Sequence, residues 1–560
     1  MSYLTKCAAA LFFLLRFTNL TAEKYYWVGN SGDWSEQANW ATISGGSTKH
    51  LQIPTPFDDV IFDENSFSQP NSTVNINVSN AVCHDFIWKN QTRKPILKST
   101  DPSFNLRIYG SLELSSNLQF QFDGGFIFES TTKGKRIKSA KQLINFIEFR
   151  GINGEWTLDD TLNVGDNRYN SGINLYAGTL ITNNHVIYTK TFKSIGSSMR
   201  KLILGSSVLH VTNTVTNPWN WNSSGGNFQI PVNNSTIYFN STERILISIN
   251  ATLNKSHYNK IILQPNNTRL GDFFQISDSN SINYIEFNNQ IENGELVGSY
   301  IQKAIFKKNV IRIYNRSSFI QSAFFHDDAN YAGDAFYDSL TFTPSHVYTF
   351  ESEKTQTKNK YWQITADCNR PIRFHASEPG NTAIIKVPNG ISILGTFLII
   401  QDIKATGGAK FTANLSYDLS NNPGWTITKI QPRTLYFVGR NYNWNDPINW
   451  SLISGGKANS SFPCIPSPID DVVFDINSFS SSTDSLIVDS RYNRCHDLTW
   501  ANTVKPCNLY SQNTSILEVY GSVFMSSNVV NLMEGTINFE AVDSSNTISS
   551  NGFHLRFKIH

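Results

Sequence analysis

The stretch that decides the fold is NLRIYGSLELSSNLQFQFDGGFIF, residues 105–128. Apolar and polar residues alternate in short runs, and a Gly or a Ser/Asn cluster separates one run from the next. An apolar period of two places one face of a strand in a core and the other in solvent, and Gly, Ser and Asn favour tight turns. The stretch therefore predicts short β-strands joined by tight turns. The alternating sets are Leu106/Ile108, Leu112/Leu114, Leu118/Phe120/Phe122 and Phe126/Phe128.

The same alternation continues from about residue 105 to residue 425, without a recognisable domain boundary. A strand–Gly–strand element recurs as YAGTLIT (176–182), LGSSVLHV (204–211), LGTFLII (394–400) and YGSVFM (520–525). A chain of β-sandwiches would also use many short strands, but it should show a boundary about every hundred residues. In a solenoid each coil packs only on its neighbours, so a run of any length shares one core. We therefore expect an all-β chain whose residues 105–430 form a right-handed parallel β-helix.

The opening of this unit occurs a second time near the C-terminus. YWVGNSGDWSEQANWATISGG (26–46) matches YFVGRNYNWNDPINWSLISGG (436–456), and CHDFIW (83–88) matches CHDLTW (495–500). These matches predict a module at 23–104 and a second unit at 434–560 that consists of the same module and its first coils, which we interpret as truncated. A solenoid end exposes core and strand edges, so Trp34, Trp40 and Pro54 suit a cap. A carbohydrate-binding aromatic platform would use the same residues.

Residues 1–22 are typical of a signal peptide, because a short polar start is followed by an apolar core and by Ala22 at the end. The charged fraction is 16% and the net charge +2, and no Lys/Arg run suggests nucleic acid as a partner. No later segment is apolar enough to predict a transmembrane helix. We therefore expect a secreted, extracellular protein, with candidate glycosylation sites that include Asn71, Asn234, Asn240, Asn250 and Asn315.

Five cysteines follow the predicted signal peptide. Cys83 and Cys368 are far apart in sequence, whereas Cys464, Cys495 and Cys507 lie close enough for one disulfide among them. The sequence does not fix which pair forms. Cys83 and Cys495 occupy matched positions, and we interpret both as small, buried apolar residues.

Several polar clusters are candidates for chemistry. Asp58-Asp59, followed by Asp63-Glu64, recurs as Asp470-Asp471 and could bind calcium or act in glycan cleavage. Adjacent strand residues point to opposite faces, so we favour a cap or turn role in which Asp binds backbone N–H groups. Asp159-Asp160 is predicted to lie in a solvated turn.

Two further clusters contain histidine. His326-Asp327-Asp328, with Asp334 and Tyr337 nearby, breaks the alternation and is predicted to lie in a loop without a partnered His or Cys. Cys83-His84-Asp85 contains a nucleophile and a base, but successive strand residues cannot form a dyad with each other. The sequence therefore assigns no catalytic residue and no cofactor, and leaves metal binding open.

The quoted opening, together with YTFESEKTQT (348–357) and IIQDIKATGGAKFTANLSYDLSNNPGWTIT (399–428), resembles tandem repeat units of large, secreted, adhesin-like bacterial surface proteins. The resemblance implies a right-handed β-helix and a non-catalytic adhesive or structural role at the cell surface, with extracellular glycans or cell-surface components as partners. The alternatives are a β-helix polysaccharide lyase or hydrolase and a passive carbohydrate- or calcium-binding module.

Overall fold

The computed structural model describes residues 22–559 except 91, 166–170, 214–218, 242–244, 251–254, 265–271, 278–279, 317, 440, 458–463, 502–503 and 555–556. The predicted signal peptide lies almost entirely outside these residues. The chain is all-β, with 1% helix and 51% strand, and forms a parallel β-solenoid of about 20 turns. The parallel solenoid expected from the sequence is confirmed. None of the helices among the described residues has the length and apolar character needed to cross a membrane.

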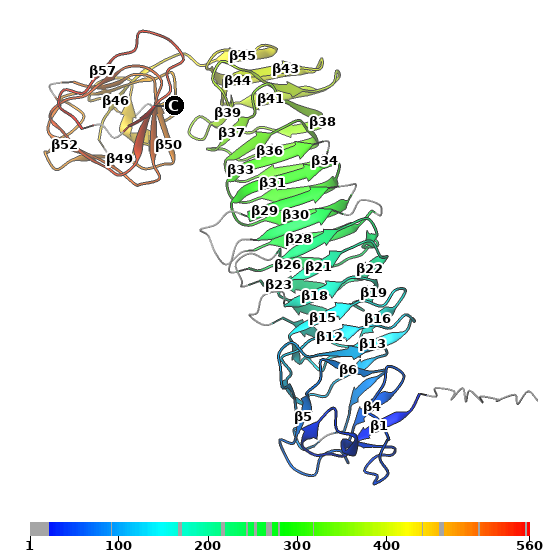
Figure 1. Ribbon diagram of the computed structural model, residues 1–560. Helices are drawn as coiled ribbons and strands as arrows, with labels where there is room; N and C mark the ends of the chain where they lie inside the picture. The colour runs from blue at the N-terminus through cyan, green and yellow to red at the C-terminus, as the bar shows by residue number, and fades with distance from the viewer. Residues whose placement is uncertain are drawn as a thin grey trace, which may run out of the picture. The chain divides into compact units, whose positions relative to one another are not determined.

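The chain divides into two compact units. Unit 1 comprises Met1–Pro218 and Asn227–Pro231, and its strands stack side by side in successive coils (Figure 1). Its first sheet contains β1 (Lys24–Trp27), β3 (Trp40–Ala41), β4 (Asp59–Phe62), β7 (Phe86–Trp88), β10 (Leu112–Glu113), β13 (Lys135–Lys138), β16 (Glu155–Leu158), β19 (Gly178–Ile181), β22 (Arg200–Ile203) and β25 (Phe228–Gln229). A second face contains β2 (Gly32–Asp33), β5 (Thr73–Ile76), β8 (Ile96–Ser99) and β11 (Gln119–Gln121). A third contains β6 (Asn80–Cys83), β9 (Asn105–Ile108), β12 (Phe126–Phe128), β15 (Phe146–Phe149), β18 (Gly172–Leu175) and β21 (Phe192–Ile195). A fourth contains β14 (Leu143–Ile144), β17 (Leu162–Val164), β20 (Val186–Thr189) and β23 (Val208–Val211).

Unit 2 comprises Trp219–Gly226 and Val232–His560, and its coils have two long faces. The first face contains β24 (Trp221–Ser224), β27 (Leu246–Asn250), β29 (Asp272–Ser277), β31 (Ile291–Val297), β33 (Val310–Arg316), β35 (Ala329–Ala332), β37 (Val347–Phe350), β39 (Ile372–Ala376), β41 (Ser392–Thr396), β42 (Leu398–Gln401), β44 (Lys410–Asp418) and β45 (Trp425–Lys429). The second contains β26 (Thr236–Phe239), β28 (His257–Leu263), β30 (Ser281–Phe287), β32 (Tyr300–Phe306), β34 (Phe319–Phe325), β36 (Ala335–Phe342), β38 (Thr355–Gln363), β40 (Ala383–Lys386) and β43 (Ile403–Thr406).

The repeated module also belongs to unit 2 and has three sheets. The first sheet contains β46 (Thr434–Phe437), β47 (Trp450–Ser451), β48 (Asp471–Phe474), β51 (Leu498–Trp500), β54 (Val523–Phe524) and β57 (Ile548–Ser549). The second contains β49 (Ser485–Val488), β52 (Cys507–Ser511) and β55 (Val529–Met533), and the third β50 (Tyr492–Cys495), β53 (Ile516–Val519), β56 (Thr536–Phe539) and β58 (Phe557–Ile559). One-turn 3₁₀ helices, Gln37–Asn39 and Pro447–Asn449, occupy matched places in the two modules.

Identical positions of successive coils stack on one another inside the solenoid. In unit 2 the rings of Phe287, Phe306 and Phe325 lie nearly parallel, with centroids 5.0 and 4.6 Å apart. Burying one such side chain contributes about 1.5–3 kcal/mol, and each ring pair adds about 0.5–1.5 kcal/mol. The stacking explains why apolar period two continues from coil to coil, because every strand must place its inward residues on those of the previous coil.

The Trp-rich opening covers the first strand of its sheet. β3 pairs antiparallel with β1, opposite the side on which β4 pairs in parallel, so the edge of β1 is not exposed. Trp34 and Trp40 are fully buried with ring centroids 4.9 Å apart, and Trp444 and Trp450 repeat this pair at 5.1 Å. These aromatic clusters support the cap interpretation. Rings without exposed surface cannot serve as a glycan platform.

The disulfide of the structure is not one of the pairs among Cys464, Cys495 and Cys507 that their proximity in sequence suggested. Cys464 pairs with Cys368, 96 residues earlier, whereas Cys495 and Cys507 are buried free thiols. The predicted burial of Cys83 and Cys495 is confirmed, because both free thiols are 0% exposed. Among the candidate glycan acceptors, Asn71 and Asn234 are exposed, but the side chain of Asn315 is buried.

Candidate functional site

The adjacent aspartates at the start of β4 face opposite sides, as expected. Asp58 is buried and accepts hydrogen bonds from the Thr55 backbone N–H at 2.9 Å, the Thr55 hydroxyl at 2.6 Å and the Glu23 N–H at 3.2 Å. Asp470 in the second module accepts matching bonds from Ser467 and also pairs with Arg433. The inner aspartate therefore fixes the local backbone in both copies.

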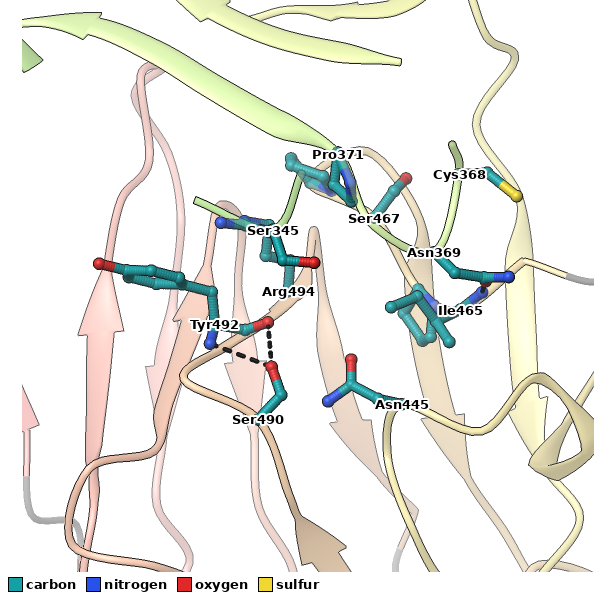
Figure 2. Close-up of a pocket in the computed structure, with 12 residues that line it drawn as sticks. Ser345, Cys368, Asn369, Pro371, Asn445, Ile465, Ser467, Ser490, Tyr492 and Arg494 are labelled. Atoms are coloured by element: carbon teal, nitrogen blue, oxygen red, sulfur yellow. Dashed lines mark hydrogen bonds between the residues drawn. The ribbon is translucent and has the colours of Figure 1, made fainter. Parts of the chain in front are cut away.

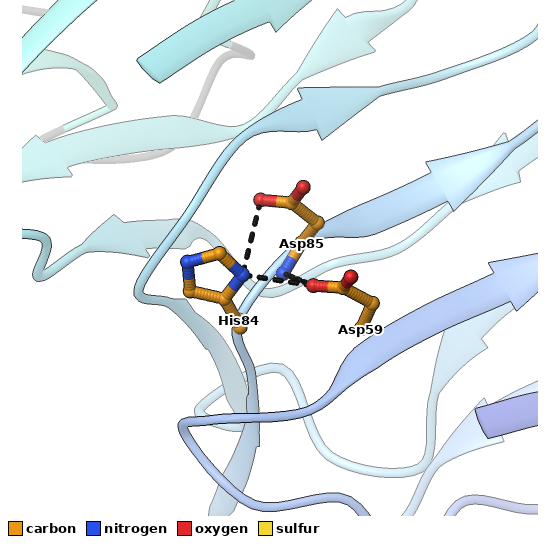
Figure 3. Close-up of side chains that lie close together, drawn as sticks. All are labelled: Asp59, His84 and Asp85. Atoms are coloured by element: carbon orange, nitrogen blue, oxygen red, sulfur yellow. Dashed lines mark hydrogen bonds and ion pairs between the residues drawn. The ribbon is translucent and has the colours of Figure 1, made fainter. Parts of the chain in front are cut away.

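The outer aspartate of each pair forms a triplet with a histidine and a second aspartate. Figure 3 shows the triplet of the first module. His84 Nδ1 lies 2.8 Å from Asp59 Oδ1 and 3.4 Å from Asp85 Oδ1. The second module reproduces these distances, because His496 Nδ1 lies 2.9 Å from Asp471 Oδ1 and 3.4 Å from Asp497 Oδ1. Comparison of neighbouring residues does not predict this arrangement, because the outer aspartate and its histidine are far apart in the sequence. The signal was available, since both histidines follow their outer aspartate by 25 residues.

Both aspartates of the triplet also accept hydrogen bonds from backbone N–H groups. Asp59 Oδ1 also accepts the Asp85 N–H at 3.2 Å, and Asp85 Oδ1 accepts the Ser111 N–H of the next coil at 2.6 Å. A Cβ atom on Gly110 would lie 2.0 Å from Asp85 Oδ1, so this carboxylate requires glycine in the recurring Tyr-Gly-Ser element. Asp497, Ser522 and Gly521 repeat the arrangement. The triplet therefore links successive coils at a corner.

The hydrogen bonds also determine the protonation of the first triplet. The hydrogen bond to Asp59 raises the pKa of His84, and the nearby charge of Asp85 adds to the effect. Burial alone would raise the pKa of Asp59, but the bonds from His84 and from the Asp85 N–H lower it. Lys135 Nζ lies 3.3 Å from His84 Nε2 and blocks the outer nitrogen. Two carboxylates and an imidazole are metal-ligand types, but the ammonium opposes a cation at this imidazole.

The cluster around Asp327 and Asp328 differs from the sequence expectation. The two residues form a turn between β34 and β35 instead of a projecting loop, and Asp328 is buried. Their histidine partner is His346, one coil later, whose Nδ1 lies 3.1 Å from Asp328 Oδ1. His326 is exposed. The prediction of a solvated loop without a partnered histidine was therefore wrong, because the length of one coil places His346 beside Asp328.

The same two aspartates contact the repeated module. Arg491 forms ion pairs with Asp327 at 3.1 Å and Asp328 at 2.9 Å, and the Tyr492 hydroxyl donates to Asp328 at 2.6 Å. Burial raises the pKa of Asp328, but hydrogen bonds from His346, Tyr492 and the Val347 N–H outweigh burial and lower it. This carboxylate is therefore an ionised structural contact.

A network of buried ion pairs also connects the solenoid coil to the repeated module. Glu518 accepts from Arg373 Nη1 at 3.0 Å and from Arg494 Nε at 2.7 Å, and Arg373 also pairs with Glu540 at 2.9 Å. Arg373, Arg494 and Glu518 are each at most 5% exposed. Burial raises the pKa of Glu518, but the two guanidinium groups outweigh it and keep the pKa low.

A cavity of about 30 Å³ lies beside this network, between Ser345, Asn369, Pro371, Asn445, Ile465 and Arg494 (Figure 2). A space of that size holds about one water molecule and no organic ligand. The Cys368–Cys464 disulfide closes one side, and the Ile465 N–H donates to Asn369 Oδ1 at 3.0 Å.

The remaining predicted site residues take structural positions. Asp159 pairs with Arg136, and Asp160 accepts from the backbone N–H and the hydroxyl of Ser139, so this pair is more engaged than a solvated turn. Asp334 accepts the Thr355 N–H at 2.7 Å, and Tyr337 is buried. Comparison of the chain with family models, with curated proteins and with solved structures found no match.

Proposed function

We propose that the chain is a secreted, non-catalytic β-solenoid protein with a structural or adhesive role outside the cell. The observation that carries the proposal is the Cys368–Cys464 disulfide, which joins a solenoid coil to the repeated module that follows it. Disulfides persist in oxidising surroundings such as the extracellular space and are rare in the cytosol. A covalent bond at this place suits a protein whose repeated parts must stay together under load.

The noncovalent contacts at the same junction support a structural role. Three arginines, Arg373, Arg491 and Arg494, bind carboxylates across or beside the junction. Removing one partner of a buried ion pair is costly, so these contacts hold a single arrangement. The clustered carboxylates that would be candidates for catalysis are engaged in hydrogen bonds with backbone or basic groups.

We expect no cleavage of polysaccharides by this chain. The test is incubation with acidic and neutral polysaccharides, followed by measurement of new reducing ends and of unsaturated uronates. The Asp58→Asn/Asp59→Asn variant should lose about 1–3 kcal/mol of stability, because it weakens bonds to a buried carboxylate, and its product release should equal the background of the wild type. Product release by the wild type that the double variant lacks would establish the enzyme instead.

A further inference from the structure

An open depression of about 520 Å³ lies on the second face of unit 2, across strands β28, β30, β32 and β34. Each of the four strands contributes two adjacent outward side chains to its surface. We infer that this depression binds a linear anionic polysaccharide that carries one acidic group per disaccharide. The inference deepens the adhesive form of the proposed function and rests on it.

Two lysines give the depression its positive charge. Lys260 Nζ and Lys303 Nζ lie 5.0 and 5.8 Å from the ring centroid of Tyr284, which stands between them. In the part of the chain that the structure describes, neither ammonium has a carboxylate within ion-pair distance. Two other lysines of the same face are neutralised, Lys307 by Glu286 at 2.6 Å and Lys360 by Asp338 at 2.7 Å. None of the described residues that line the depression is acidic, so the two ammonium groups give it a positive charge.

A row of primary amides runs beside the lysines, formed by Asn259, Asn283, Gln302 and Gln321. Asn283 Nδ2 donates to Asn259 Oδ1 at 3.2 Å, and Gln321 Oε1 accepts the Tyr300 hydroxyl at 2.9 Å. Each amide offers two donor hydrogens and two acceptor lone pairs, so most of this capacity remains for a ligand. Hydroxyl groups of a sugar chain use both donors and acceptors.

The distance between the two lysines determines how far apart the acidic groups of the polysaccharide should be. Lys260, Tyr284 and Lys303 are aligned in register on three consecutive strands. Neighbouring strands lie about 4.8 Å apart, so the two lysine positions are separated by roughly 10 Å along the solenoid axis. One pyranose ring of an extended chain has about the length of one strand spacing. A polysaccharide aligned with the axis would therefore place an acid on every second sugar opposite a lysine.

Charge density disfavours a nucleic acid as the occupant. A polyphosphate carries a charge on every residue and is bound by many cations along its length, whereas this depression offers two free ammonium groups and four neutral amides. The aromatic rings hold the two ammonium groups in place, because Tyr284 lies between the lysines and Lys303 Nζ also lies 4.9 Å from the ring centroid of Phe324.

The experiment uses the full mature chain and oligosaccharides of equal length in isothermal titration calorimetry. The probes are unsulfated chondroitin, with one carboxylate per disaccharide, oligogalacturonate, with one per sugar, and neutral maltodextrin; single-stranded DNA is a fourth ligand. The test variant is Lys260→Gln/Lys303→Gln. The control, Lys307→Gln/Lys360→Gln, removes the same charge from lysines that already have carboxylate partners.

We expect chondroitin to bind more tightly than the other three ligands, with an affinity that falls as salt increases. The test variant should bind it at least about tenfold more weakly, and the control within about twofold of the wild type, with unchanged circular dichroism in both. Absence of chondroitin binding, equal losses in the two variants, or tighter binding of oligogalacturonate, DNA or maltodextrin would overturn the inference. Because cleavage is measured separately, failure of binding leaves the non-catalytic structural role standing.

Discussion

Replacing Glu518 by glutamine should lower the free energy of unfolding of unit 2 by about 3–5 kcal/mol, because the buried Arg494 loses its partner carboxylate and the buried Arg373 keeps only Glu540. Arg373 and Arg494 both pair with this carboxylate, and none of the three side chains is more than 5% exposed. The change is measured by urea unfolding, followed through tryptophan fluorescence, as the shift in the transition that includes the repeated module.

The matched control is Glu540→Gln. Glu540 also pairs with Arg373 but is more exposed, and its loss leaves Arg373 bonded to Glu518. We expect a loss of about 1 kcal/mol, near the lower limit for a hydrogen bond to a charged group. Equal effects of the two substitutions would show that the network does not stabilise the junction through Glu518.

Replacing Lys358 by methionine should stabilise the chain by several kcal/mol at pH 7. Lys358 is 1% exposed on β38, its Nζ has no hydrogen-bond partner among the described residues, and burial lowers its pKa to about 6. The unfolded chain binds a proton near pH 10.4, so between about pH 6 and 10 folding must release it. The stability of the wild type therefore rises with pH across this window, whereas the Lys358→Met variant should lose that slope.

Lys138→Met is the control for this substitution. Its side chain is 51% exposed and pairs with Glu113, whose side chain is 39% exposed, so the expected change is below about 1 kcal/mol. The measurement is urea unfolding at several pH values. If the free energy of unfolding depended on pH in the same way in the wild type and in the Lys358→Met variant, Lys358 would not be buried as a neutral amine.

The sequence predicted the local structure better than the contacts between coils. Period two identified the strands, and the repeated Asp-Asp and Cys-His-Asp elements identified residues that the structure brings together. The pairing of Asp59 with His84 required the length of one coil, which the alternation alone does not give. Likewise, His346 reaches Asp328 and Cys368 reaches Cys464 only because intervening residues wind into coils. Sequence proximity grouped Asp328 with His326, and Cys464 with Cys495 and Cys507, without fixing a partner for either.

Single-molecule pulling tests the central claim, that Cys368–Cys464 joins the solenoid coil to the repeated module in a protein built to stay connected. The wild type, secreted under oxidising conditions and held at its two ends, should unfold without extending the residues enclosed by the disulfide. The Cys368→Ser/Cys464→Ser variant should gain about 330 Å of contour length, given the sequence separation of 96 residues and roughly 3.3–3.6 Å per extended residue. Equal contour lengths of wild type and variant would contradict the account.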